Sequence, residues 1–98
     1  MSQSIDLTLI GKAGCHLCDD ARVVVHAVVG EFRAEHTGVA RHVQVNLVEH
    51  DILFDEALAA KYAEEIPVLL INGKVHNYWR IDPERLRAAL EDLAPWRL

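Results

Sequence analysis

The chain has 98 residues and a net charge of -5, and it is 51% hydrophobic and 26% charged, which predicts a single globular domain spanning residues 1–98. It lacks the basic footprint of a nucleic-acid-binding protein, and apolar runs such as 68–71 are far too short to cross a bilayer. No basic segment followed by a long apolar stretch opens the chain, so we expect a cytoplasmic protein. We expect a monomer that binds neither nucleic acid nor membranes.

The first half of the chain alternates between strand and helix patterns. Residues 5–10 alternate and are β-branched, which predicts a strand ahead of a turn over 11–14. Over 15–36, apolar residues recur every three or four positions, which predicts a helix ended by Thr37-Gly38. Its expected inner face consists of Leu17, Ala21, Val24, Val25, Val28 and Phe32. Residues 42–48 alternate again and predict a second strand.

A polar loop over 49–51 leads into the second predicted helix. That helix spans 52–63. Its expected inner face is Leu53, Ala57, Leu58 and Tyr62, and we expect Phe54 in the core as well. Pro67 then interrupts the chain, and the apolar run 68–71 predicts a buried strand.

The last third of the chain predicts a hairpin followed by a helix. Asn72-Gly73 is the strongest short hairpin signal, and it connects to a strand over 74–79. Asp82-Pro83 suits the N-cap and first position of a helix whose inner stripe is Leu86, Ala89, Leu90 and Leu93. The order β-α-β-α-β-β-α predicts an α/β fold. Its four-stranded mixed sheet has parallel first strands, an antiparallel hairpin and helices on both faces.

Both cysteines of the chain lie in Cys15-His16-Leu17-Cys18, at the predicted start of the first helix. A pair this close is a poor structural staple, because a disulfide stabilises mainly by closing a long loop. A CxxC near a β-α-β pattern instead indicates redox chemistry. First-turn N–H groups and the helix dipole favour a thiolate at Cys15, so we assign Cys15 as the nucleophile and Cys18 as the resolving thiol. Asp19 and Asp20 compete for the same dipole, which favours a reductant-like pair.

Three segments carry a resemblance to a known family: Lys12 to Cys18, Leu58 to Tyr62 leading into Ile66-Pro67-Val68-Leu69-Leu70, and Asn72-Gly73. They resemble the thioredoxin fold and, within it, the glutaredoxin-like proteins of bacteria. The resemblance implies a cis Pro67 that faces the cysteines. It also implies a thiol–disulfide oxidoreductase that reduces protein or low-molecular-weight disulfides and requires no cofactor. Glutathione or another low-molecular-weight thiol is the implied co-substrate.

Four residues around the cysteines are predicted to bind substrate. The resemblance implies that Lys12 approaches the thiolate and meets a carboxylate of glutathione. Ile66, just before Pro67, can offer its backbone to an extended thiol peptide by strand addition. Arg80 has the planar fork that suits a substrate carboxylate. By topology we also expect 49–51 near the cysteines.

The chain departs from glutathione-binding glutaredoxins at two places. They carry a Gly-Gly-x-x-Asp-like segment where this chain has residues 79–82, Trp-Arg-Ile-Asp, and they usually have Pro-Tyr where it has His16-Leu17. The sequence therefore leaves the thiol partner open. Two other functions also stay open: metal or iron–sulfur cluster binding through Cys15 and Cys18, and partner binding without turnover.

Overall fold

The computed structural model of the protein describes residues 3–36 and 43–94. Its elements, in chain order, are β1 (Gln3–Gly11), α1 (His16–Glu35), β2 (Val43–Asp51), the 3-10 turn η2 (Ile52–Phe54), α2 (Glu56–Tyr62), β3 (Val68–Ile71), β4 (Lys74–Tyr78) and α3 (Pro83–Asp92). Thr37-Gly38, the predicted end of the first helix, and residue 42 lie outside the described residues.

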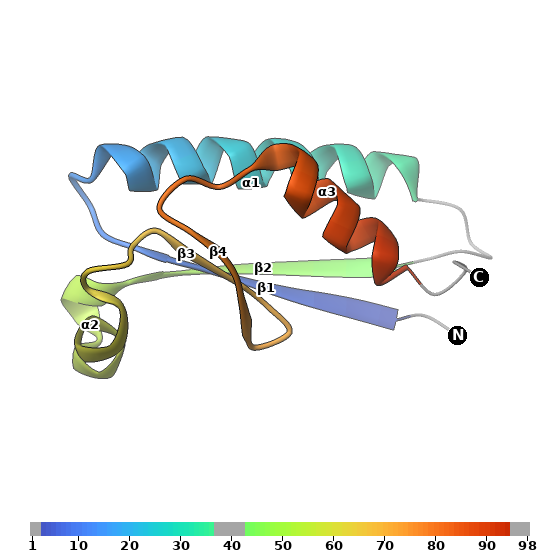
Figure 1. Cartoon of the computed structure of the whole chain (residues 1–98). Helices are drawn as coiled ribbons and strands as arrows, with labels where there is room; N and C mark the ends of the chain where they lie inside the picture. The colour runs from blue at the N-terminus through green and yellow to red at the C-terminus, as the bar shows by residue number, and fades with distance from the viewer. Residues whose placement is uncertain (1–2, 37–42, 95–98) are drawn as a thin grey trace.

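The four strands form one mixed sheet in the order β2-β1-β3-β4. β1 runs parallel to β2, in a register that pairs residue 3 with 43 and Gly11 with Asp51. β1 is antiparallel to β3, which in turn is antiparallel to β4. The predicted fold class is confirmed, and the carboxyl ends of β1 and β2 meet at the sheet end where α1 begins (Figure 1).

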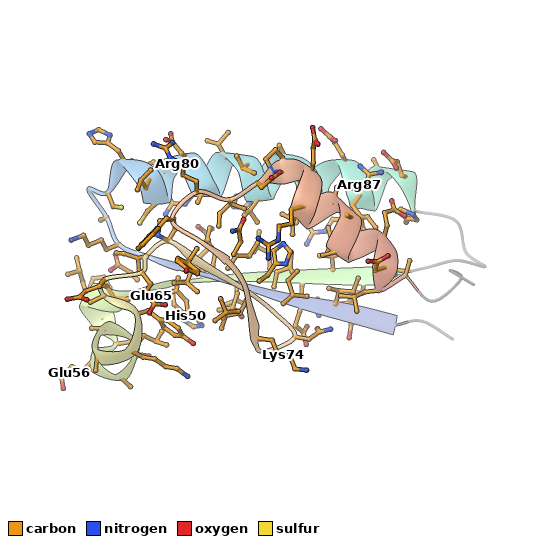
Figure 2. All side chains as sticks on the ribbon, viewed as in Figure 1. His50, Glu56, Glu65, Lys74, Arg80 and Arg87 are labelled. Atoms are coloured by element: carbon orange, nitrogen blue, oxygen red, sulfur yellow. The ribbon has the colours of Figure 1, made fainter. Side chains whose placement is uncertain are left out.

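The β3–β4 connection is the predicted Asn72-Gly73 hairpin. Both residues have positive φ, 51° at Asn72 and 84° at Gly73, as a two-residue hairpin turn requires. The Asn72 side chain fixes the turn to the central strand, because its Oδ1 accepts a hydrogen bond from the Asp6 N–H at 2.9 Å. Lys74 is exposed at this tip, away from the start of α1 (Figure 2).

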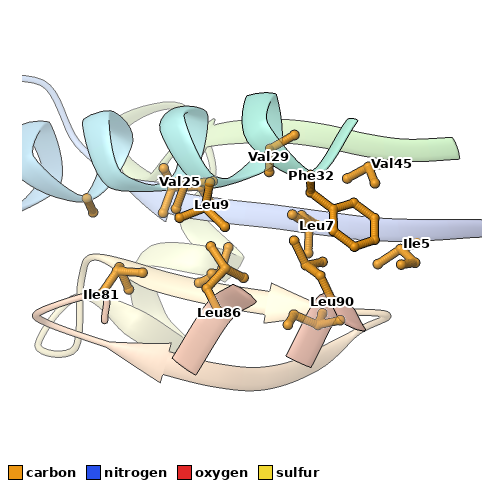
Figure 3. Packing of buried hydrophobic residues seen from close by; sticks show 14 of the residues in the cluster. Ile5, Leu7, Leu9, Val25, Val29, Phe32, Val45, Ile81, Leu86 and Leu90 are labelled. Atoms are coloured by element: carbon orange, nitrogen blue, oxygen red, sulfur yellow. The ribbon is translucent and has the colours of Figure 1, made fainter. Parts of the chain in front are cut away.

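The helices cover both faces of the sheet. α1 and α3 lie side by side on one face, and α2 covers the other (Figure 1). Alternate residues of β1 contribute to the two layers. Ile5, Leu7 and Leu9 join the cluster that α1 and α3 cover, whereas Ile10 packs with Ile52, Tyr62 and Val68. Phe32 of α1 and Leu86 and Leu90 of α3 are fully buried in the larger cluster (Figure 3). The rigid layer beneath α1 holds the first turn of this helix against the sheet.

The predicted polar loop over 49–51 is wrong, because these residues continue β2. Glu49, His50 and Asp51 pair with the last residues of β1. β2 is an edge strand, so these polar side chains stay exposed or half-buried while their backbone extends the sheet. This extension brings them alongside the loop that leads to α1.

The predicted helix over 52–63 is also wrong in its first turn. Asp51 and Asp55 both have extended backbones, and each accepts a hydrogen bond from a following N–H, at Leu53 and Leu58 respectively. Two side-chain caps four residues apart divide the segment into η2 and α2. Leu53 is consequently 65% exposed and Phe54 89% exposed, so neither joins the core; Ala57, from the expected inner face, is also exposed.

The start of α3 confirms its sequence signals. The Asp82 side chain accepts from the N–H groups of Glu84 and Arg85, and Pro83 opens the helix. Leu93, expected on its inner stripe, is instead exposed at the C-cap. Because α3 begins at a fixed cap, the segment 79–81 between β4 and α3 is held beside the first turns of α1.

Candidate active site

Cys15 is the N-cap residue of α1, with extended backbone angles of φ -106° and ψ 117°. Its Sγ accepts a hydrogen bond from the Cys18 N–H at 3.3 Å, and its carbonyl accepts from the Asp19 N–H at 3.0 Å. The side chain is half-buried, so one side remains open to solvent. A helix N-terminus directs N–H groups and positive partial charge at such a sulfur, which is the kind of environment in which reactive cysteines lie.

Cys18 lies one turn further along α1 and is only 4% exposed. Burial, followed by the hydrogen bond with Cys15, raises the pKa of the Cys18 thiol to about 11. The negative charges of Cys15 and Asp19 act in the same direction, whereas the Lys12 backbone N–H lowers this pKa. The two thiols are both free, and Cys15 is the more accessible of them. The raised pKa keeps the Cys18 thiol protonated near neutral pH.

Gly11, the last residue of β1, makes room for the buried thiol. A Cβ at this position would lie 3.0 Å from the Cys18 Sγ and 3.2 Å from the Cys18 Cβ. Ordinary carbon contacts are about 3.5–4.0 Å. The backbone of β1 therefore approaches Cys18 as closely as only glycine allows.

A small cavity of about 130 Å³ opens beside the Cys18 thiol. It is lined by Leu9, Gly11, Lys12, Cys18, Arg22, Glu49, His50, Asp51 and Pro67. Figure 2 shows His50 at this end of the sheet. The Ile66-Pro67 peptide bond is cis, as the resemblance implied. The cavity gives the buried thiol a polar route toward solvent.

An ion-pair network forms one wall of this cavity. The Arg22 Nε donates to Glu49 at 2.6 Å, and Glu49 also lies 3.3 Å from the His26 Nε2. The hydrogen bond from Arg22 lowers the pKa of Glu49, and Glu49, with a smaller contribution from Asp19, raises the pKa of Arg22. Arg22 is not among the predicted site residues, although it follows Cys18 by four residues and therefore shares its helix face.

Asp51 connects the loop before Cys15 to the end of β2. Its Oδ2 accepts from the Ala13 N–H at 3.2 Å, while its Oδ1 caps η2 at Leu53. Gly14 in the same loop has a φ of 79°, a conformation that glycine adopts without strain. The carboxylate and the glycine together set the path by which the chain enters α1.

The structure brings two of the four predicted substrate residues beside Cys18. Lys12 and Pro67 line the cavity beside Cys18. Ile66 is half-buried and packs against the smaller hydrophobic cluster. Arg80 instead lies beside the beginning of α1 (Figure 2), in a groove with Leu17. The expected approach of 49–51 is confirmed at Cys18, and Trp79 lies in the Arg80 groove.

Within residues 3–36 and 43–94, no group of three or more His, Cys, Asp or Glu side chains is arranged to hold a metal ion. Among the helices of the same ranges, none is both long and apolar enough to span a membrane.

Comparison with known proteins places the chain among glutaredoxin-like sequences. The family model described as "Glutaredoxin-like domain (DUF836)" matches residues 6–91. The uncharacterized protein Rv0508 of Mycobacterium tuberculosis is 30% identical over 80 residues, covering 82% of this chain and 76% of Rv0508. The uncharacterized protein Mb0520 of Mycobacterium bovis matches to the same extent.

Solved structures share the fold. The crystal structure of the structural-genomics target XcR50 from X. campestris has a TM-score of 0.63 at 30% identity, covering 88% of this chain and 96% of XcR50. The oxidised thioredoxin from Plasmodium falciparum has a TM-score of 0.56 at 13% identity, covering 92% of this chain and 81% of the thioredoxin. The fold is therefore thioredoxin-like.

Proposed function

The chain belongs to the glutaredoxin-like family, and we propose that it is a thiol–disulfide oxidoreductase that reduces disulfides with Cys15 as nucleophile and Cys18 as resolving thiol. The observation that carries this proposal is the arrangement of the two sulfurs. An open Cys15 caps α1 and accepts the Cys18 N–H, while Cys18 itself is buried one turn below.

The first step is an attack by the Cys15 thiolate on one sulfur of the substrate disulfide. A bond forms between Cys15 and that sulfur, the substrate disulfide breaks, and the second substrate sulfur leaves as a thiolate. The attacking species must be the thiolate, and the helix N-terminus favours it at Cys15. The adjacent Ile66-Pro67 segment offers backbone for an extended substrate, as in strand addition.

The second step depends on Cys18 losing its proton. Two of the causes that raise the pKa of Cys18 are the hydrogen bond and the charge of Cys15. Both change once Cys15 is bound to substrate, because its sulfur no longer carries a negative charge. Attack by the first thiol therefore lowers the barrier to deprotonating the second. Cys18 then bonds to Cys15, and the substrate sulfur leaves as a thiolate.

The product is a reduced substrate and a Cys15–Cys18 disulfide, so each turnover moves one electron pair. The proposed reaction needs no resident cofactor, because the two thiols carry the electrons themselves. A second thiol must return the pair to the dithiol form, and we propose glutathione, another low-molecular-weight thiol or a thiol reductase. This cycle requires a reducing compartment such as the cytoplasm.

The proposal is tested by trapping the mixed disulfide. A Cys18→Ser variant incubated with a disulfide substrate should accumulate one substrate half bound to Cys15, detected by mass spectrometry, because the second step is blocked. Wild type should instead release the reduced substrate and retain a Cys15–Cys18 disulfide, and Cys15→Ser should form no mixed disulfide.

The same variants separate enzyme from binding module. A protein that only binds partners would retain the interaction with both cysteines replaced by serine, and its Cys18→Ser variant would trap no substrate. That outcome would contradict the proposed activity.

A further inference from the structure

A groove of about 400 Å³ lies beside the first turn of α1, on Leu17, Tyr78, Trp79 and Arg80. Leu17 stands between the two cysteines in sequence, so this groove begins within the turn that carries the reactive sulfur. A smaller cleft of about 160 Å³ continues it toward Ala21 and Ile81, with Asp20 on its rim. Because Leu17 lies two residues from Cys15, a polypeptide bonded to Cys15 is long enough to reach this surface.

The aromatic wall of the groove is held in place from below. The Trp79 backbone N–H donates to the Pro67 carbonyl at 2.8 Å, and its indole Nε1 donates to the Glu64 carbonyl at 3.1 Å. Tyr78 meets the indole edge-on, with ring centroids 5.0 Å apart. Trp79 nevertheless remains 51% exposed, so the ring presents an ordered apolar surface to solvent.

The backbone of Trp79 is strained at this point. Its φ is 65°, a region that a bulky residue adopts only when its surroundings impose it. Here the hydrogen bonds from Trp79 to the carbonyls of residues 64 and 67 hold the backbone at this φ. A local strain maintained for a half-exposed ring beside a reactive thiol points to a use for that ring in binding.

Among the described residues that line the larger groove, Arg80 is the only charged one. Its side chain is exposed, and it makes no hydrogen bond or ion pair with any residue in 3–36 or 43–94. Arg22, the cation on the following turn of α1, is by contrast already paired with Glu49. A free guanidinium at the end of an apolar groove complements a carboxylate carried next to an apolar side chain.

Resting on the proposed function, we infer that Leu17, Trp79 and Arg80 form a subsite for a polypeptide disulfide. Its reacting cysteine would lie next to an apolar side chain and an acidic one. The apolar side chain packs on Leu17 and Trp79 while the carboxylate pairs with Arg80. The substrate class is therefore an acidic, partly apolar segment of a protein, because the groove contacts the two side chains next to the reacting cysteine.

The test measures the first chemical step in a Cys18→Ser background. The probes are capped tripeptides with a central cysteine activated as the 2-pyridyl disulfide. Cys15 bonds to the peptide sulfur and the neutral 2-thiopyridone leaves, which gives an optical rate. Leucine or glycine stands on one side of the cysteine and glutamate or glutamine on the other, in both orders.

We expect glutamate probes to react about two- to fivefold faster than glutamine probes at low salt, the range of an exposed ion pair. We expect leucine probes to react about tenfold faster than glycine probes, the effect of partly burying one such side chain. Arg80→Gln should remove the first preference, whereas Lys74→Gln, the same charge change at the far hairpin tip, should keep it.

Trp79→Gly tests the apolar wall without adding backbone strain, because glycine adopts this φ freely. It should reduce the leucine preference, and Trp79→Phe should retain much of it. Equal rates for all probes in the parent protein would overturn the subsite while leaving the oxidoreductase intact. No reaction with any probe would overturn the proposed function and the subsite with it.

Discussion

Adding one methyl group at Gly11 is the sharpest steric test of the site. In Gly11→Ala the new Cβ would lie 3.0 Å from the Cys18 Sγ and 3.2 Å from its Cβ. Cys18 is buried and short, so it has no flexible end that can move aside. The first turn of α1 or the end of β1 must shift by several tenths of an ångström.

The size of the effect follows from two opposing contributions. Overpacking a well-packed site costs about 1–3 kcal/mol. Replacing glycine at a compatible backbone position stabilises by about 0.4–1 kcal/mol, because the unfolded chain loses freedom. The two ranges leave a net loss of about 0–2.6 kcal/mol in the free energy of unfolding, and their midpoints leave about 1.3 kcal/mol. The shift should also slow formation of the Cys15–Cys18 disulfide more than the initial attack by Cys15.

The measurement is urea unfolding of the reduced protein, together with the rate of mixed-disulfide resolution. Gly30→Ala is the matched control, because a Cβ there meets nothing within 4 Å. In the middle of α1 it should stabilise by about 0.8–1 kcal/mol. Cys18→Ala should recover part of the Gly11→Ala loss in a double-mutant cycle. If Gly11→Ala matches the stability gain of Gly30→Ala and resolves at the parental rate, the packing argument is refuted.

Three further predictions concern charged and titratable groups. Asp51→Ala should lower the free energy of unfolding by about 0.5–2 kcal/mol as a lost cap. It should also slow the attack by Cys15, because the carboxylate accepts a hydrogen bond from the Ala13 N–H. Asp55→Ala should lower the stability by a similar amount with no change in that rate, and equal rates for the two variants would contradict the positioning role of Asp51. Arg22→Gln should move the pH dependence of mixed-disulfide resolution to higher pH, and Glu49→Gln should move it to lower pH. The two variants remove opposite charges from the wall of the Cys18 cavity. Shifts of the same sign would contradict an effect of these charges on the Cys18 thiol. Burial lowers the pKa of His76, whose Nε2 has no partner among the described residues. Because the unfolded chain then binds a proton more readily than the folded chain, the free energy of unfolding should fall as the pH drops from about 7.5 to 5.5. His76→Leu should flatten this part of the pH profile in urea unfolding, and an unchanged slope would exclude His76 as its cause.

The sequence predicts best where local chemistry decides the structure. Cys15 at a helix start, the Asn72-Gly73 turn and the Asp82-Pro83 cap all act through hydrogen bonds and φ preferences within a few residues. Such signals need no knowledge of the rest of the fold. Together with the alternating and helical spacing of apolar residues, they predict the order of the elements and the position of the dithiol.

The residues that the sequence misjudged depend on tertiary surroundings. Phe54 has helical spacing to its apolar neighbours, but the cap at Asp55 ends η2 and leaves the ring in solvent. Arg22 became part of the site only because β2 extends to Asp51 and brings Glu49 to it. Neither the competition between two caps nor the length of a strand pairing is visible in a local apolar pattern.

The central claim is that Cys15 and Cys18 cycle between a dithiol and a disulfide. The most direct measurement is an equilibrium titration in glutathione redox buffers, with thiols trapped by alkylation and counted by mass spectrometry. We predict that both cysteines lose their reactivity together as the buffer becomes oxidising, and that the mass falls by two hydrogens with no glutathione attached. A protein that retains the Cys18 thiol in every buffer, or carries only glutathione on Cys15, would contradict the dithiol mechanism.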